Sequence, residues 1–115
     1  MAKILIADDS LFMRNVLKSI LSKEDHDLIE AENGEETLKK FDSEKPDLVL
    51  LDIIMPEVDG IEVLKKIGKK VKVIVISAVG QKKMVDEAKE LGALDYIVKP
   101  FDNARVLETV KKALE

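Results

Sequence analysis

Five residues of this sequence could carry out chemistry together, and each lies at the end of a short, mainly apolar run. They are Asp8, Asp9, Asp52, Ser77 and Lys99. The runs that precede them are residues 4–7, 48–51, 71–76 and 96–98. Two carboxylates about 4 Å apart repel each other by roughly 1 to 4 kcal/mol, depending on how well water screens them. An adjacent pair such as Asp8 and Asp9 is therefore kept where water solvates both side chains or where a cation lies between them.

The apolar runs predict strands, and the segments between them predict helices. Residues 4–7 and 48–51 are apolar throughout, which is typical of parallel strands buried on both faces of a sheet. Residues 28–31 and 96–98 are shorter runs flanked by charge, as edge strands often are. The intervening segments carry apolar side chains at helical spacing.

This alternation predicts an α/β fold with one doubly wound, five-stranded parallel sheet and helices on both faces. The flavodoxin-like strand order 2-1-3-4-5 places the charged strands at the edges and the apolar strands inside. The carboxyl ends of parallel strands share one edge of the sheet, and the first and third strands are neighbours in this order. We therefore expect all five candidate residues to converge in one cleft.

The donor set indicates a magnesium and phosphoryl site. Asp8, Asp9 and Asp52 offer only oxygen ligands, to which the backbone carbonyl of Ile54 could add one, and such a set suits Mg²⁺, Mn²⁺ or Ca²⁺ better than zinc. No calcium-binding loop and no glycine-rich nucleotide loop is present. A site with few carboxylates favours Mg²⁺ beside a phosphoryl group. Lys99 and Ser77 could bind that group, and Asp52 could accept it covalently.

Four motifs together resemble the receiver domain of two-component response regulators. They are "ADDSLFMR", "LVLLDIIMPEVDG", "VISAVGQ" and "DYIVKPF", and the resemblance runs from residue 1 to residue 115 in the same order. It implies that Asp8 and Asp9 bind Mg²⁺ and that Asp52 accepts phosphate from a histidine kinase. Ser77 and Lys99 would contact the phosphoryl oxygens. Tyr96 would act as an aromatic switch, together with Ser77, and the Lys99–Pro100 bond would be cis.

The resemblance also implies a signalling role. The chain would catalyse only its own phosphorylation and dephosphorylation, so it would not be a conventional enzyme. Phosphorylation would draw Ser77 toward the phosphoryl group, let Tyr96 move inward and change the surface of the fourth helix, fifth strand and fifth helix. In chemotaxis and motility control, the partners would be a kinase resembling CheA and the flagellar motor switch.

Two departures from the usual receiver pattern lead to further expectations. The short connection "KKIGKKVKV" predicts that the third helix ends early, at Gly68. Ile54 and Val79 lie two positions after Asp52 and Ser77, where receiver domains often carry polar residues. Two apolar side chains beside the phosphoryl group should hinder an attacking water, so we expect slow autodephosphorylation.

Length and composition limit the other classes of function. The 115 residues suit one receiver domain, residues 1–115, without an effector domain. The net charge of −4 gives no support for nucleic-acid binding, and the absence of cysteine excludes disulfides and thiolate chemistry. No run is long enough for a signal peptide or a membrane span. We expect a cytoplasmic monomer that contacts proteins and neither nucleic acid nor membrane.

Three alternatives remain open from the sequence. Asp8 and Asp9 could be a solvated pair in which Asp9 caps the first helix. The chain could be an aspartyl-phosphate phosphatase, although such enzymes carry two aspartates separated by one residue where this chain has Asp8-Asp9-Ser10. It could also use the receiver fold as a binding module that does not need phosphorylation. Within the favoured class, a phosphorelay intermediate and a motility regulator are not separated.

Overall fold

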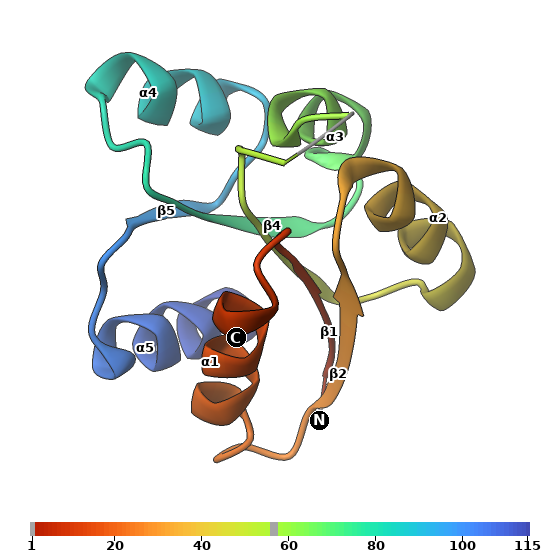
Figure 1. Cartoon of the computed structure of the whole chain (residues 1–115), viewed down its shortest axis with the longest axis vertical. Coiled ribbons are helices and arrows are strands. Elements are labelled where there is room, and N and C mark those ends of the chain that lie inside the picture. The colour runs from red at the N-terminus through yellow and green to blue at the C-terminus, as the bar shows by residue number, and fades with distance from the viewer. Residues whose placement is uncertain (1, 56–57) are drawn as a thin grey trace.

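The computed structural model describes residues 2–55 and 58–115 as five strands alternating with five helices (Figure 1). The strands are β1 (Lys3–Ala7), β2 (Asp27–Ala31), β3 (Leu48–Leu51), β4 (Lys72–Ser77) and β5 (Asp95–Val98). The helices are α1 (Leu11–Leu21), α2 (Gly34–Glu44), α3 (Gly60–Ile67), α4 (Lys82–Glu90) and α5 (Asn103–Leu114). Every strand overlaps the apolar run that predicted it.

All pairings within the sheet are parallel, and the strand order is β2-β1-β3-β4-β5. This is the predicted doubly wound order, with the two charged strands β2 and β5 at the edges. In the register, Ala7 of β1 lies opposite Leu51 of β3 and Ala31 of β2. The three strands therefore reach the same edge of the sheet together, which aligns the residues that follow them.

Two apolar cores form, one on each face of the sheet. Alternate residues of β1 point to opposite faces, so Leu5 packs with α2, α3 and α4, whereas Ile4 and Ile6 pack with α1 and α5. Figure 1 shows the same division, with α1 and α5 on one side of the sheet and the other three helices on the far side. Burial on both faces explains why β1 and β3 read as continuous apolar runs.

The helix ends follow the polar residues that flank them. Asn33 and Asp59 accept hydrogen bonds from the backbone N–H groups of Glu36 and Glu62, so each side chain caps the start of its helix. The Glu36 carboxylate differs from the usual reciprocal cap, because it accepts from the N–H of Glu32. Helix α3 is capped at Gly68, which confirms the predicted early end.

Gly92 follows the C-cap residue of α4, Leu91, and has a positive φ of 116°, as a glycine that ends a helix commonly does. The turn that the sequence predicts after Asp52 includes residues 56 and 57, which lie outside the described residues. Within the described part of the chain, no helix is both long and apolar enough to cross a membrane.

Candidate functional site

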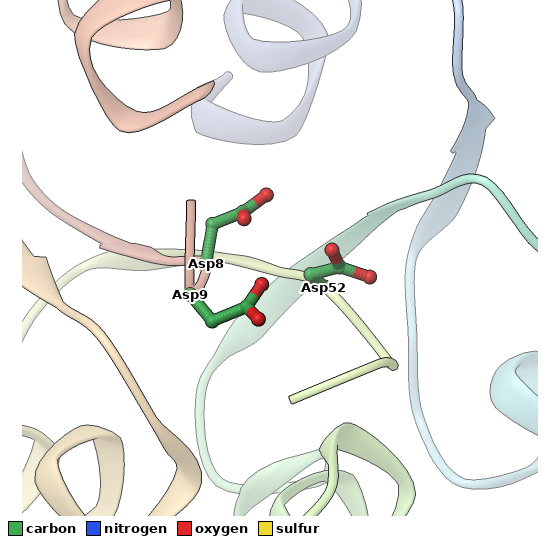
Figure 2. Close-up of side chains that lie close together, drawn as sticks. All are labelled: Asp8, Asp9 and Asp52. Carbon is green, nitrogen blue, oxygen red and sulfur yellow. The ribbon is translucent and has the colours of Figure 1, made fainter. Parts of the chain in front are cut away.

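Three carboxylates lie together at the carboxyl edge of the sheet (Figure 2). Asp8 and Asp9 come directly after β1, and Asp52 comes directly after the neighbouring strand β3. One carboxylate oxygen from each residue lies within 4.8 Å of the others. Asp8 and Asp52 are only 2% and 7% exposed, whereas Asp9 is exposed. The predicted convergence of these three side chains is therefore present.

Lys99 joins this cluster from the end of β5. Its Nζ donates hydrogen bonds to Asp8 Oδ2 at 2.8 Å and to Asp52 Oδ2 at 3.0 Å. Burial alone would lower the pKa of Lys99, but the hydrogen bonds to both aspartates outweigh it and raise the pKa above its ordinary value. Lys99 therefore stays protonated and offsets part of the charge of the acidic cluster. The Lys99–Pro100 bond is cis, as the resemblance implied.

Asp8 is held by both its backbone and its side chain. Its N–H donates to the Ala31 carbonyl at 3.1 Å, and its Oδ1 accepts from the N–H of Ser10 at 2.9 Å. Burial raises the pKa of Asp8 above its ordinary value, although the hydrogen bonds from Lys99 and Ser10 act in the opposite direction. The N-cap of α1 is Ser10, so Asp9 does not cap the helix. That finding removes the structural alternative for the aspartate pair.

Asp52 is fixed by the backbone around it. Its N–H donates to the Ala7 carbonyl at 2.9 Å, which extends the pairing of β1 and β3 by one residue. Its Oδ1 accepts from the N–H of Ile54 at 3.0 Å. Ile54 lies two positions after Asp52 in the sequence and is 56% exposed. The carboxylate is thus fixed between Lys99 on Oδ2 and the Ile54 backbone on Oδ1.

Ser77 and Tyr96 lie on β4 and β5, on the other side of β3 from Asp8. Ser77 is fully buried as the last residue of β4, and its Oγ accepts from the N–H of Val79 at 3.2 Å. Tyr96 is only 6% exposed, and its hydroxyl donates to the Val79 carbonyl. Burial raises the pKa of this hydroxyl, so it remains a donor at neutral pH. The ring that was expected to move inward already lies inside in this structure.

Arg14 contacts the site and was not predicted from the sequence. The Arg14 side chain, from α1, donates to the backbone carbonyl of Asp8 and to the carboxylate of Glu30 on β2. Arg14 also lies on the buried face of its helix, three positions before Leu17. A charged residue inside an apolar helical stripe is the signal that could have pointed to it, because a buried charge needs a partner.

The arrangement has the properties of a site for a small hard cation. Three formal negative charges face one ammonium group, and the available donors are oxygens, which Mg²⁺ and similar ions prefer. The three carboxylate oxygens lie within 4.8 Å of one another, so they are close enough for one cation to be shared among them. The donor set therefore fits a divalent cation, and Asp52 adds a carboxylate that can act as a nucleophile toward phosphorus.

Comparison with known proteins agrees with this geometry. The family model described as the response regulator receiver domain matches residues 4–111. The chemotaxis protein CheY of Listeria monocytogenes is 52% identical over 117 residues, covering 98% of this chain and 98% of its own length. Sporulation initiation phosphotransferase F of Bacillus subtilis is 44% identical and covers 97% of this chain and 93% of its own length.

Solved structures extend the comparison to three dimensions. The signal receiver domain of a putative Luxo repressor protein from Vibrio parahaemolyticus has a TM-score of 0.94 at 26% identity, covering 98% of this chain and 89% of that one. Sequence, strand order and acidic site therefore agree, and the chain belongs to the response regulator receiver domain family.

Proposed function

We propose that this protein takes a phosphoryl group from the phosphohistidine of a kinase onto Asp52 and signals through the contacts that change as a result. The observation that carries the proposal is the position of the Asp52 carboxylate, which accepts from the Lys99 ammonium at 3.0 Å and lies within 4.8 Å of the carboxylates of Asp8 and Asp9. The family supports a phosphoacceptor role rather than that of a conventional enzyme.

Mg²⁺ is the cation that we assign to the acidic cluster. Asp8, Asp9 and Asp52 would hold it with their carboxylates, and the backbone carbonyl of Ile54 would add a further oxygen. Bound there, Mg²⁺ would neutralise charge on the transferring phosphoryl group. The adjacent pair after β1 supplies two of these ligands, so Asp52 would need to offer only one of its two oxygens to the cation.

The transfer itself requires a nucleophile and a charge partner from this chain. A carboxylate oxygen of Asp52 forms the new P–O bond while the P–N bond to the donor imidazole breaks. The Lys99 ammonium bonds Asp8 and Asp52, and its one remaining donor position can bind a phosphoryl oxygen. The Ser77 hydroxyl would donate to another phosphoryl oxygen after it gives up its contact with the N–H of Val79.

The output would be a changed protein surface. Val79 connects the two switch residues, because its N–H bonds Ser77 and its carbonyl accepts from the Tyr96 hydroxyl. When Ser77 turns toward the phosphoryl group, the N–H of Val79 would lose its hydrogen bond to the Ser77 hydroxyl. The segment that leads into α4 could then shift. We assign the partner-binding surface to α4, β5 and α5 for this reason.

The biological setting that we infer is chemotaxis and motility control. The relative from Listeria monocytogenes is named as a chemotaxis protein and matches nearly the whole chain. The upstream partner would then be a histidine kinase resembling CheA, and the target would be a protein such as the flagellar motor switch. These partners place the chain in the cytoplasm, where we expect it to act as a monomer.

A phosphorelay intermediate is the second candidate. Sporulation initiation phosphotransferase F, whose name describes group transfer, is 44% identical to this chain. A relay protein passes its phosphoryl group on to another histidine, whereas a chemotaxis regulator keeps it until hydrolysis. Transfer from the phosphorylated protein to a histidine phosphotransfer domain would separate the two candidates.

The direct test is incubation with Mg²⁺ and acetyl phosphate, followed by mass spectrometry of the intact protein. We expect a gain of one phosphoryl group, absent in Asp52→Asn and present in the control Asp42→Asn, which alters an exposed aspartate of α2. Phosphorylation of Asp52→Asn to the wild-type extent would contradict the assignment of the acceptor. Turnover of many equivalents of a phosphate ester would favour a phosphatase instead.

The phosphorylated form should be long-lived. Ile54 and Val79 place apolar side chains two positions after the acceptor and after Ser77, and neither can orient an attacking water. We expect Ile54→Asn to shorten the half-life of the acyl phosphate by giving that water a hydrogen-bond partner. A wild-type half-life of only seconds in Mg²⁺, without an added phosphatase, would contradict this expectation.

A further inference from the structure

We propose that Arg14 is a positioning residue for metal binding, because it fixes the peptide that joins Asp8 to Asp9. The inference rests on the Mg²⁺ site proposed above and adds to it a residue that contacts neither the cation nor the phosphoryl group. Arg14 would act through the backbone, by setting the direction in which the exposed carboxylate of Asp9 projects.

The contacts of Arg14 are those of a buried clamp. Its Nη1 donates to the backbone carbonyl of Asp8 at 2.7 Å, and its Nε donates to Glu30 Oε1 at 2.9 Å. The residue is only 8% exposed although it carries a permanent charge. The planar guanidinium presents donors in a fixed fork, so holding both acceptors at once fixes the position of the Asp8 carbonyl.

Strand β2 anchors this clamp from the other side. Glu30 receives a second hydrogen bond, from Lys18 of α1 at 2.9 Å, and these bonds lower its pKa, so it remains an anion at neutral pH. The next residue of the strand, Ala31, accepts from the N–H of Asp8. Both backbone polar groups of Asp8 are therefore tied to β2, one directly and one through Arg14.

The fixed carbonyl matters because a peptide unit is planar. The carbonyl of Asp8 and the N–H of Asp9 lie in one plane, so a hydrogen bond that orients the first also orients the second. The side chain of Asp8 has further supports in Lys99 and Ser10. The side chain of Asp9 is exposed, and the backbone orientation is what directs it toward Asp52.

A purely electrostatic role for Arg14 makes the opposite prediction. A positive charge next to an acidic cluster disfavours a bound cation, so removing that charge would strengthen Mg²⁺ binding. Removing a positioning residue weakens binding instead, because the ligands must then be ordered when the cation binds. The sign of the change in affinity therefore decides between the two roles.

The experiment measures the Mg²⁺ dissociation constant of the full chain by calorimetry, without a phosphoryl donor. We expect Arg14→Met to raise the constant by about tenfold or more, as changes behind metal ligands commonly do. The control Lys18→Met removes a positive charge from the same helix and the same Glu30, and we expect its constant to stay within about twofold of wild type. In nuclear magnetic resonance spectra without metal, Arg14→Met should shift the Asp9 amide signal most.

Each outcome of this experiment bears on the proposal. A constant for Arg14→Met that is unchanged or lower than that of wild type overturns it, as does an equal weakening in Lys18→Met. If Arg14→Met does not fold, Arg14→Lys keeps the charge but offers a single ammonium to two acceptors, and an unchanged constant there overturns the proposal. Wild-type protein that does not bind Mg²⁺ would contradict the proposed function itself, and this inference with it.

Discussion

Helices α1 and α4 each follow a strand whose carboxyl end carries a candidate site residue, yet they are held to the rest of the molecule very differently. Helix α1 buries four residues and is capped at its start by Ser10, whose side chain accepts from the N–H of Met13. Helix α4 buries only Ala88 among the described residues, and Gln81 at its N-cap makes no side-chain cap bond. One helix is thus a fixed support for the site, and the other is weakly anchored.

The ion pairs of α1 and α4 differ in the same direction. Two cationic side chains of α1, Arg14 and Lys18, reach across to Glu30 on β2 and tie the helix to the sheet. In α4, Lys82 pairs with Asp86 of the same helix, which adds no attachment to the sheet. Lys82 also lies in the first turn, where the helix dipole disfavours positive charge.

The contrast is compatible with the proposed function, in which one small domain both binds a cation and changes shape. Metal ligands must be held in place before the cation arrives, and α1 and β2 do this for Asp8 and Asp9. The proposed change of surface on phosphorylation would instead require a low cost of rearrangement, and the sparse anchoring of α4 is compatible with that requirement.

The largest expected effect is the loss of unfolding free energy when an apolar side chain that packs beneath each helix is shortened. Leu17 of α1 is only 2% exposed, so Leu17→Ala should lower the free energy of unfolding by about 2 to 5 kcal/mol. Val85 of α4 is half-buried, so Val85→Ala should lower it by about 1 kcal/mol. Urea denaturation of both variants measures the two free energies. Equal losses would show that α4 is anchored as firmly as α1.

Metal binding should stabilise the part of the molecule around Asp8 and Asp9 more than it stabilises α4. A saturating ligand that binds only the folded state, at about one hundred times its dissociation constant, raises the free energy of unfolding by about 2.7 kcal/mol. We expect Mg²⁺ to raise the melting temperature of the wild-type protein and to raise it much less in Asp9→Asn. On addition of Mg²⁺, amide hydrogen exchange should slow more around Asp8 than in α4. Equal slowing in both places would argue against the difference in anchoring between α1 and α4.

The helix caps give a smaller effect with opposite signs at the two helices. Ser10→Ala removes the side-chain cap of α1 and should cost about 1 kcal/mol of unfolding free energy. Gln81→Asp supplies the missing cap of α4 and a favourable charge beside Lys82, so it should add about 0.5 to 1 kcal/mol. Thermal denaturation checks both changes. A destabilising Gln81→Asp would mean that the start of α4 is already satisfied by other contacts.

The parts of the site that the sequence predicts are those fixed by the sheet. Apolar runs locate the strands, and parallel pairing brings the residues after each run to one edge, so Asp8, Asp52 and Lys99 could be placed together without coordinates. The edge positions of β2 and β5 followed from their charge in the same way. These features depend on backbone pairing and on the alternation of apolar runs with helical segments, and both can be inferred from a single sequence.

The contacts made between neighbouring elements were not predictable. Whether Arg14 reaches Asp8 and Glu30 depends on how closely α1 packs against β2 and on the rotamer that this packing allows. The inward position of Tyr96 depends likewise on the space beside Val79. Lateral packing of this kind leaves only indirect signals in a sequence, such as a charged residue on an apolar helix face.

The smallest expected effect concerns the ion pairs of the two helices and depends on pH. The hydrogen bond from Lys18 is the main reason that the pKa of Glu30 lies below its ordinary value of 4.5, with Arg14 adding to it. The unfolded chain therefore binds more protons in this range, and the stabilising contribution is present above pH 4.5 and lost as the pH falls through the lowered pKa. Glu30→Gln should cost up to about 1 kcal/mol near neutral pH, because the pair is partly exposed, and nothing in strong acid.

The matched change in α4 is Asp86→Asn, which removes an exposed pair that ties the helix only to itself. We expect a free energy of unfolding close to that of wild type there, since screening by water leaves little to lose at an exposed pair. Urea denaturation from acid to neutral pH compares the two variants. A larger loss of unfolding free energy in Asp86→Asn than in Glu30→Gln would reverse the comparison. The ion pair between α1 and β2 would then stabilise the fold less than the ion pair within α4.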